Sequence, residues 1–532
     1  MGGYSVRVRR WARGVEMYVR ALGIVALVLS GCNKDDGDQN KPATDNPNLW
    51  TVADSPVQLD EDWIVEAGDT LVIEPGVTVE LGEEVNLIVR GELIARGTTE
   101  SPITFTRADD AELWGSIHFE DTAIDASFAN VDEYDGGSII LHAVVEYGQR
   151  AVKIESSSPY IASTVFQDNL IPSDIDPIGG SALSIRDGSY SRIRDCVFER
   201  NAAELFAFGG AVYVHHADPI FQDNLFAHND ATYGGALATD IMASPIVGNT
   251  FDNNTTISEG GGFSLISTIS AVLNNTITNN HAVKDGGGLH VCVTCYPHSA
   301  PFIMDNTVTG NTTDDSAEEG AAGIGAAYIK VLRDNNISDN FGADGASDFG
   351  WYHDLEEGYP NWVSHPSIAD NYWGSTDLDF IGETIHDGLD DQDLGVITWD
   401  PILTDAVAGP TTRVTITSRK LTYIDNGDDM SVFLTLYNPG PERSIHLDIQ
   451  LAAGDLASAW DGSLDFPGAV AADGGWNLIL PENSVYFSML QEGTYSGDDG
   501  TGGGYWSAAI TDAATSAPIG IESISPFDYT QP

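Results

Sequence analysis

Basic residues are scarce in this 532-residue chain, which has 23 Lys and Arg against 80 Asp and Glu and a formal net charge of −57. A surface this acidic repels polyanions, so the composition argues against a nucleic-acid partner. The same repulsion counts against a polyuronate substrate unless Ca²⁺ bridges the carboxylates of protein and sugar. Solubility in a salty or crowded exterior, where salt screens the charges, is the simpler explanation of the acidity.

Long apolar segments are also lacking. The run Ala21 to Leu29, which follows five Arg, is too short to cross a bilayer as a helix but has the length of an export-signal core. The residues that follow, Leu29-Ser30-Gly31-Cys32, resemble the lipobox of bacterial lipoproteins. This resemblance implies a signal peptide over residues 1–32, a lipid anchor on Cys32 and membrane lipid as a partner. Because Asn33 replaces the Asp of inner-membrane retention, the expected destination is the outer membrane or cell surface.

Helical periodicity is missing as well, because no window of a dozen residues keeps a 3.6-residue apolar period free of Gly. Instead, an apolar residue followed three positions later by Asn occurs seven times, at steps that by subtraction are 25 to 32 residues. A period of this length with about three short β-type runs per unit predicts the coils of a parallel β-helix, stacked at about 4.8 Å. The pairs are Phe166/Asn169, Phe198/Asn201, Phe226/Asn229, Phe251/Asn254, Ile277/Asn280, Val308/Asn311 and Ile337/Asn340.

Each element of this repeat has a structural explanation. We expect the apolar residues to form one internal file. We expect each Asn to adopt the left-handed conformation at a corner, and its amide to bond to the next rung. Gly pairs such as Gly209-Gly210 serve where the backbone bends without a side chain. No chemistry is assigned to the Asn residues.

Three segments carry a family resemblance. Residues 234–254 closely resemble the repeats of secreted bacterial proteins of the right-handed parallel β-helix, or pectate-lyase-like, superfamily. Residues 93–119 are similar to their N-terminal coils, and residues 371–401 to their closing coil. The resemblance implies a β-helix over residues 49–408, after a flexible polar tether at 33–48. It does not choose a function, because the superfamily contains lyases, hydrolases, epimerases and adhesins.

The repeat ends near Thr411, and strictly alternating runs such as 430–437 follow at regular spacing. This pattern predicts an antiparallel, Ig-like β-sandwich over residues 409–532. The predicted fold class is therefore all-β, a right-handed parallel β-helix followed by a β-sandwich. Residues 120–137 are acidic and poorly periodic, so we expect a loop that projects from one coil.

Tryptophan is absent between Trp114 and Trp351. We expect Trp373 and Trp399 to cap the end of the solenoid, where rungs would otherwise be exposed. A Gly- and Pro-broken segment beyond the repeat offers aromatic rings for carbohydrate contact. Its residues are Trp351, Tyr352, Tyr359 and Trp362.

The remaining cysteines give a second candidate site. Cys292 and Cys295 form a C-x-x-C in an insertion flanked by His290 and His298. This pattern suits a local disulfide or a Zn²⁺ site, and outside the cytoplasm we favour the disulfide. Cys196 falls in the register of a repeated Asn, which predicts a core position.

Enzymes of this superfamily place acids, bases and Ca²⁺ ligands on the outer face of one stacked sheet. The polar residues that follow the Gly groups include His215, Asp240 and His290, which we name as catalytic candidates in one file. Neither a pair of adjacent Asp, as in polygalacturonase-like hydrolases, nor the base of a lyase is recognised there. No cofactor is required; a Ca²⁺ site or simple Asp-Gly turns would both explain Asp387, Asp390, Asp391 and Asp393.

The sequence thus predicts a lipid-anchored surface scaffold for binding or adhesion, with a neutral glycan or another cell-surface molecule as ligand. The alternative is a polysaccharide lyase or glycoside hydrolase that works on the face near His215.

Overall fold

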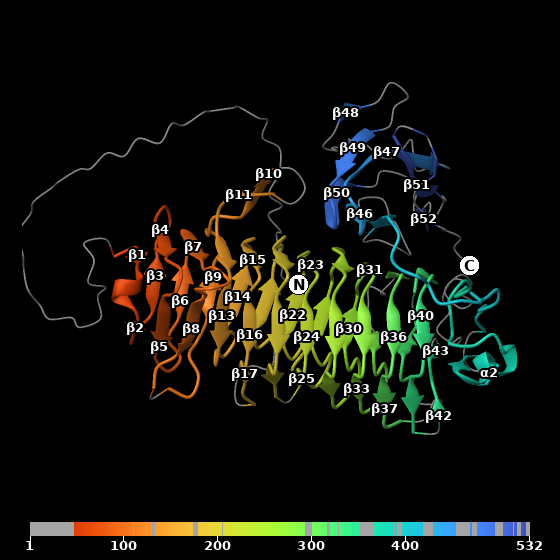
Figure 1. The fold of residues 1–532 in the computed structure, drawn as a ribbon, viewed down its shortest axis with the longest axis horizontal. Helices are drawn as coiled ribbons and strands as arrows, with labels where there is room; N and C mark the ends of the chain where they lie inside the picture. Colours follow the sequence, from red (N-terminus) through yellow and green to blue (C-terminus); the bar gives the residue numbers. More distant parts are fainter. Residues whose placement is uncertain are drawn as a thin grey trace, which may run out of the picture. The chain divides into compact units, whose positions relative to one another are not determined.

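The computed structural model describes residues 47–527 with internal gaps. The residues left out after 47 are 110, 130–132, 174–178, 205, 293–300, 316–319, 328, 344, 352–366, 388, 391–395, 419–428, 454–468, 471–475, 495–503, 514, 516 and 519–522. Figure 1 shows a solenoid of stacked parallel strands followed by a set of antiparallel strands. Among the described residues, no helix is long and apolar enough to cross a membrane.

The solenoid has three long parallel sheets, which we number sheets 1 to 3. Sheet 1 contains β1 (Leu49–Trp50), β4 (Thr70–Ile73), β7 (Glu92–Arg96), β12 (Ile139–Leu141), β15 (Tyr160–Ala162), β19 (Arg192–Arg194), β23 (Ile220–Gln222), β27 (Ile246–Val247), β31 (Ala271–Leu273), β35 (Phe302–Met304) and β39 (Val331–Arg333). Sheet 2 contains β2 (Val57–Leu59), β5 (Thr78–Leu81), β8 (Ile103–Arg107), β13 (Ala143–Glu146), β16 (Val165–Gln167), β20 (Val197–Glu199), β24 (Leu225–Ala227), β28 (Thr250–Asp252), β32 (Thr276–Thr278), β36 (Thr307–Thr309) and β40 (Asn336–Ser338). Sheet 3 contains β3 (Trp63–Val65), β6 (Leu87–Val89), β9 (Ile117–Phe119), β14 (Val152–Glu155), β18 (Leu183–Arg186), β22 (Val212–His215), β26 (Leu237–Asp240), β30 (Phe263–Ile266), β34 (Leu289–Val291), β38 (Ile324–Ala326), β43 (Phe349–Trp351) and β44 (Ile385–His386).

A fourth sheet begins only part of the way along the solenoid, so the expectation of three strands per coil is incomplete. Its strands have two residues each, and all pair in parallel except the last two. Sheet 4 contains β17 (Leu170–Ile171), β21 (Ala202–Ala203), β25 (Asp230–Ala231), β29 (Thr255–Thr256), β33 (His281–Ala282), β37 (Thr312–Thr313), β41 (Phe341–Gly342) and β42 (Gly345–Ala346). Two short helices, η1 (Val52–Asp54) and α2 (Leu378–Glu383), lie near the two ends of the solenoid.

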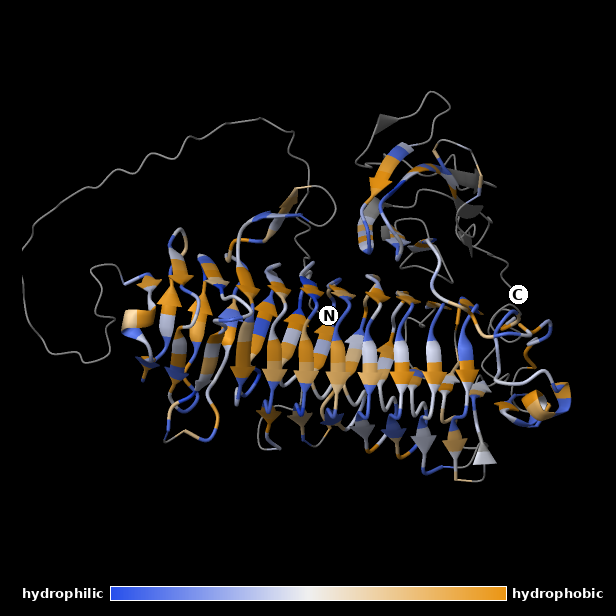
Figure 2. Ribbon diagram, in the orientation of Figure 1, coloured by the Kyte–Doolittle hydropathy of each residue, from blue (hydrophilic) through white to orange (hydrophobic). Residues whose placement is uncertain are grey.

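The predicted apolar file is present inside the solenoid. Phe166, Phe198, Phe226 and Phe251 are fully buried and pair in register on sheet 2. Successive ring centroids are 4.9, 4.7 and 4.7 Å apart with nearly parallel rings, which matches the spacing of stacked strands. Figure 2 shows hydrophobic colour concentrated on the strands and hydrophilic colour on many of the turns.

The Asn residues form the expected ladder, but their backbone conformation was predicted wrongly. From Asn169 to Asn311 each side-chain Nδ2 donates to Oδ1 of the next Asn, as from Asn229 to Asn254 at 2.9 Å, and Asn340 at the end of the ladder donates to Asp348 instead. A second ladder, which includes Asn224 and Asn249, follows the same rule. The left-handed conformation belongs to the residue before each ladder Asn, for example Asn253 with a φ of 56°. The corner therefore needs two residues, one to turn the chain and one to satisfy its polar groups.

The C-terminal segment forms two antiparallel sheets that fit the predicted sandwich. The first contains β45 (Arg413–Ser418), β46 (Asp429–Asn438) and β50 (Ser484–Thr494). The second contains β48 (Ala469–Val470), β49 (Trp476–Leu480), β47 (Arg443–Ala453), β51 (Gly504–Asp512) and β52 (Ser523–Phe527).

Several contacts join this segment to the outer face of sheet 1. That face is largely apolar from β23 onward, and Tyr437 and Val485 pack in one cluster with its buried residues, such as Leu273. The guanidinium of Arg413 makes two hydrogen bonds to the carboxylate of buried Asp305, at 2.6 and 2.7 Å. Strands such as β31 and β35 therefore have apolar residues on both faces, as expected for a sheet covered on both sides.

The acidic insertion 120–137, which we expected to be a loop, contains a β-hairpin. Its strands β10 (Ser127–Ala129) and β11 (Glu133–Gly136) pair antiparallel, and they project from the solenoid in Figure 1. The hairpin lies beside β15, an interior strand of sheet 1, because Phe128 and Tyr134 contact Tyr160 on that strand.

Candidate functional site

The outer face of sheet 3 brings two of the three catalytic candidates together. His215 is the last residue of the four-residue strand β22, and Asp240 is the last residue of the four-residue strand β26. The two strands pair in register, so these residues are direct neighbours. His215 Nδ1 lies 2.8 Å from Asp240 Oδ2. The two side chains are 35% and 23% exposed, so they form a partly buried pair that solvent can reach.

The pair has the geometry of an oriented base. A carboxylate that accepts the Nδ1 proton fixes the tautomer in which Nε2 carries the lone pair. Among the described residues, none hydrogen-bonds to Nε2 of His215. The hydroxyl of Tyr213 lies 3.5 Å from His215 Nδ1, and burial raises its pKa to about 12. The phenol therefore stays protonated at neutral pH.

His290 does not belong to this file, so that prediction is wrong. Its register partner is Ser264, in the row that contains Tyr213, whereas the row of His215 and Asp240 continues to Ile266. His290 is 3% exposed, and its Nδ1 lies 3.2 Å from the hydroxyl of Ser264. Burial lowers its pKa, so it is a neutral, packed imidazole rather than a solvent-facing acid or base.

Basic residues, which the sequence did not reveal on this face, lie beside the pair. Arg186 is the register partner of His215, and its guanidinium lies 5.8 Å from the centroid of the Tyr213 ring. One rung earlier, Glu155 contacts Lys153 at 2.8 Å and His118 at 3.0 Å. Burial alone would raise the pKa of Glu155, but these two neighbours lower it overall.

A charged strip five strands wide therefore runs along sheet 3, from β9 to β26. The sequence pattern could have predicted this strip, because every second residue of β14, β18 and β22 is polar and alternate residues of a strand share one face.

Among the described residues, the aromatic candidates for carbohydrate contact near the C-terminal end of the solenoid do not form a binding surface. Trp351 is 1% exposed inside the solenoid core, so it cannot stack on a sugar from solvent. Tyr352, Tyr359 and Trp362 lie outside the described residues. The capping prediction is confirmed, because Trp373 is buried in the core and Trp399 packs against it.

Two of the four candidate Ca²⁺ ligands, Asp387 and Asp390, accept backbone N–H groups of a turn. Asp387 is 2% exposed, and its two oxygens accept N–H groups of Leu389 and Ile397 at 2.8 and 2.9 Å. Asp390 accepts the N–H of Asp387 at 3.3 Å, while Asp391 and Asp393 lie outside the described residues. Within the part of the chain that the structure describes, no group of His, Cys, Asp or Glu is arranged to hold a metal ion.

The cysteines divide as expected where they are described. Cys292 is disulfide-bonded, and its predicted partner Cys295 lies outside the described residues, as does Cys32. Cys196 is a free, buried thiol, and its N–H donates to Asn224 Oδ1 at 2.9 Å. It therefore occupies a ladder position, as its register predicted.

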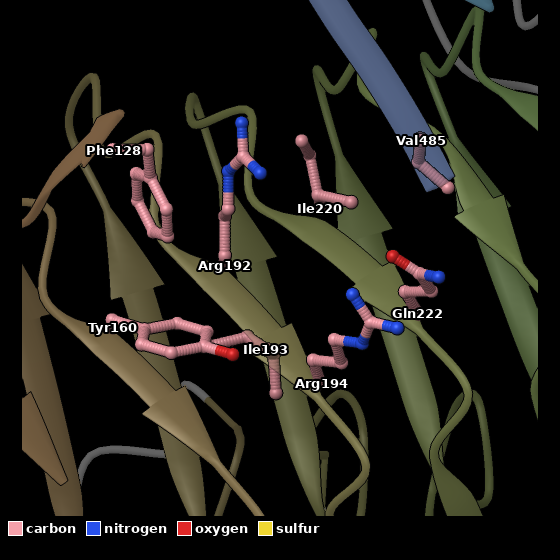
Figure 3. Close-up of a pocket in the computed structure, with 8 residues that line it drawn as sticks. All are labelled: Phe128, Tyr160, Arg192, Ile193, Arg194, Ile220, Gln222 and Val485. Carbon is pink, nitrogen blue, oxygen red and sulfur yellow. The ribbon is translucent and has the colours of Figure 1, made fainter. Parts of the chain in front are cut away.

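A small, shallow cleft that the sequence did not predict lies on the outer face of sheet 1. Tyr160, Arg192 and Ile220 occupy one register row across β15, β19 and β23, and Arg194 and Gln222 occupy the next. Figure 3 shows these side chains with Phe128 of the hairpin at one side and Val485 of β50 at the other.

Aromatic rings form one wall of this cleft. Phe128 meets Tyr160 edge to face at 5.3 Å, and Tyr134 stacks on Tyr160 at 5.9 Å. The guanidinium of Arg192 lies 4.2 Å from the centroid of Phe128, and that of Arg96 lies 5.4 Å from the centroid of Tyr134. Such contacts hold both the rings and the cations in place.

Comparison with known proteins supports the architecture. Residues 134–312 match the family model described as a right handed beta helix region. No curated protein and no solved structure matches the chain. The match covers repeats of the solenoid and includes part of the hairpin and all of β19.

Proposed function

We propose that this chain, a right-handed parallel β-helix repeat protein, is a scaffold that binds glycans in the cleft on sheet 1. The observation that carries the proposal is the group of Phe128, Tyr134 and Tyr160, which an inserted hairpin brings together beside β15 of sheet 1. Flat apolar rings beside polar side chains suit the apolar faces and hydroxyl groups of sugar rings.

The anchor that the lipobox resemblance implies would display this site at the cell surface. Cys32 would carry the lipid, and residues 33–48 would hold the solenoid away from the membrane. Growth of the producing cells with an alkyne-labelled fatty acid tests this part. Label should appear on the wild-type chain and be lost from Cys32→Ser; a labelled Cys32→Ser variant would contradict the anchor.

A glycan array probed with the purified full chain tests the binding function. Tyr160→Ala should weaken binding about two- to twelvefold, because one stacked ring is worth about 0.5 to 1.5 kcal/mol. Phe341→Ala is the matched control, since this ring is 50% exposed on sheet 4, away from the cleft. Absence of any bound glycan, or equal loss in both variants, would overturn the proposal.

A second candidate function, polysaccharide cleavage, is favoured by the His215–Asp240 pair. The imidazole would accept a proton at Nε2, Asp240 would hold its tautomer, and protonated Tyr213 would donate. Incubation with a panel of polysaccharides, followed by reducing-sugar release and double-bond absorbance, tests it. His215→Gln should abolish turnover, whereas His281→Gln on sheet 4 should not; a wild-type chain without turnover would remove this candidate. His290→Ala is a poor test, because His290 is buried and its loss would disturb packing.

A further inference from the structure

Sheet 3 is bordered by a row of residues that each precede a Gly with a positive φ. Hydrogen bonds between neighbouring turns keep this row in register: Gly234 N–H donates to Glu259 O, and Gly260 N–H donates to Asp285 O, both at 2.9 Å. The row consists of Phe208, Tyr233, Glu259 and Asp285. Successive members lie about 4.8 Å apart, so two aromatic rings are followed by two acids along the solenoid.

The two acids of this row lack a basic partner. Within the described residues, no Lys or Arg lies within ion-pair distance of Glu259 or Asp285, whereas Glu155 contacts Lys153 at 2.8 Å. The side chain of Glu259 is 33% exposed, and its carboxylate accepts no hydrogen bond from a described residue. Solvent therefore reaches an acid whose charge the protein leaves uncompensated.

A buried imidazole points between the two acids. His290 is 3% exposed, and its Nε2 lies 3.8 Å from Asp285 Oδ2 and 3.9 Å from Glu259 Oε2. Both distances exceed a hydrogen bond, so Nε2 has no hydrogen-bond partner in the described part of the chain. In the tautomer whose Nδ1–H donates to Ser264 Oγ, Nε2 presents a lone pair to the space between the carboxylates.

Asp285 reaches this place because the neighbouring coil has no side chain there. The row of His290 continues to Gly325, where a Cβ would clash with the carboxylate of Asp285. Burial raises the pKa of Asp285 to about 7, and the nearby charges of Glu259 and Asp315 act in the same direction. A cation beside these acids would favour their ionised forms.

We propose that this part of sheet 3 binds glycans that carry protonated amines, with Glu259 and Asp285 as acceptors for an ammonium group and Tyr233 as a face for the sugar ring. An ammonium group has three donors, so one group can serve both carboxylates and His290 Nε2. A half-buried ring such as Tyr233 suits the apolar face of a sugar, and a cation near its face is also favoured.

The charge of the whole chain supports this ligand class. A net charge of −57 attracts a cationic glycan and repels an anionic one. The row on sheet 3 is separate from the cleft on sheet 1, so this proposal does not rest on the function proposed for that cleft.

Two hexasaccharides with the same backbone test the ligand class. Binding of the purified full chain to the hexamer of N-acetylglucosamine and to the hexamer of glucosamine is measured by calorimetry at mildly acidic pH, where free amines are protonated. We expect at least about tenfold tighter binding of the glucosamine hexamer, as one charge-assisted hydrogen bond would provide. Hexalysine carries as many amines without sugar rings, and it should bind more weakly than the glucosamine hexamer.

Matched variants locate the site. Glu259→Gln should remove most of the tenfold preference. Glu80→Gln on β5 of sheet 2 removes the same charge outside the row, where the carboxylate accepts a hydrogen bond from Gln58 at 3.2 Å, and it should keep the preference. Circular dichroism checks that each variant is folded.

Each contrary result has a definite meaning. Equal affinity for the two hexasaccharides, or no binding of either, would overturn the proposal. Equal loss of the preference in Glu259→Gln and Glu80→Gln would also overturn it, because the attraction would then come from the charge of the whole chain. Binding of hexalysine as tight as that of the glucosamine hexamer would overturn the assignment to glycans. The cleft on sheet 1 is tested separately by the glycan array.

Discussion

The ladder of buried Asn residues is the feature whose energetic contribution can be worked out most directly. In Asn254→Ala, the lost side chain takes four hydrogen bonds with it. Its Oδ1 accepts the N–H and the Nδ2–H of Asn229 at 3.0 and 2.9 Å, and its Nδ2 donates to Asn280 Oδ1 and Phe226 O at 2.9 and 3.0 Å. Asn280 Oδ1 keeps a donor, because the N–H of residue 254 also bonds to it at 2.9 Å.

Two donors of Asn229 lose their acceptor inside a site with no exposed surface. Each buried, unsatisfied donor costs about 1 to 3 kcal/mol, so we expect a loss of about 2 to 6 kcal/mol. Each coil contacts only its neighbours, so the loss should appear as local opening of the coils on either side of residue 254.

Hydrogen exchange followed by mass spectrometry measures this opening. Peptides that cover residues 221–256 should exchange at least about thirtyfold faster in the variant, which corresponds to the lower end of the estimate. Thr276→Ala serves as the control, because Thr276 is exposed on the neighbouring coil and should change stability by less than about 0.5 kcal/mol. If Asn254→Ala exchanged no faster than Thr276→Ala, the ladder would not stabilise the solenoid as argued.

Three further predictions concern buried polar groups. Arg413→Met leaves the buried carboxylate of Asp305 without its cation, so protease cleavage between the solenoid and the C-terminal segment should be faster than in the wild type. The double variant with Asp305→Asn should be cleaved more slowly than Arg413→Met alone. An unchanged cleavage rate in Arg413→Met would contradict the role of the pair. Burial raises the pKa of Asp285 to about 7 from an ordinary 3.8, so its contribution to the free energy of unfolding is full below about pH 4 and is lost as the pH rises through 7. In denaturant titrations, the stability of Asp285→Asn relative to the wild type should therefore increase from pH 4 to above pH 7. A difference in stability that stays constant with pH would refute the assignment. Burial raises the pKa of the Cys196 thiol to about 12, so iodoacetamide should modify it only in the unfolded chain, and rapid labelling of the native protein would be inconsistent with its ladder position.

The solenoid was predictable because its determinants recur at a fixed place in each coil. A buried file such as Phe198 and Phe226 and a bonded pair such as Asn229 and Asn254 both follow from stacking identical positions about 4.8 Å apart. The short strands of sheet 4 were missed because two residues cannot show alternation. The hairpin was missed for a related reason, since the three residues of β10 are too few to stand out in an acidic segment.

His290 was assigned to the wrong row because its position after the Gly group was not counted from the same Gly as in the other coils. The sequence alone allows this count to be made correctly. The first Gly of each group, such as Gly209 and Gly286, has a positive φ. Counted from that Gly, Tyr213 and His290 are both four residues on, whereas His215 is six residues on. Since a strand directs alternate side chains to the same face, both positions lie on the outer face of sheet 3, but they belong to different rows, and Tyr213 and His290 are buried there.

The cleft on sheet 1 could be predicted only in part. The pattern Arg192-Ile193-Arg194 indicates two cations on one face of a strand. Phe128 lies beside Arg192 because of the direction in which the hairpin projects, and no local sequence pattern specifies that direction. Trp351 is the opposite case: the sequence suggested an exposed ring, but tertiary packing buries it.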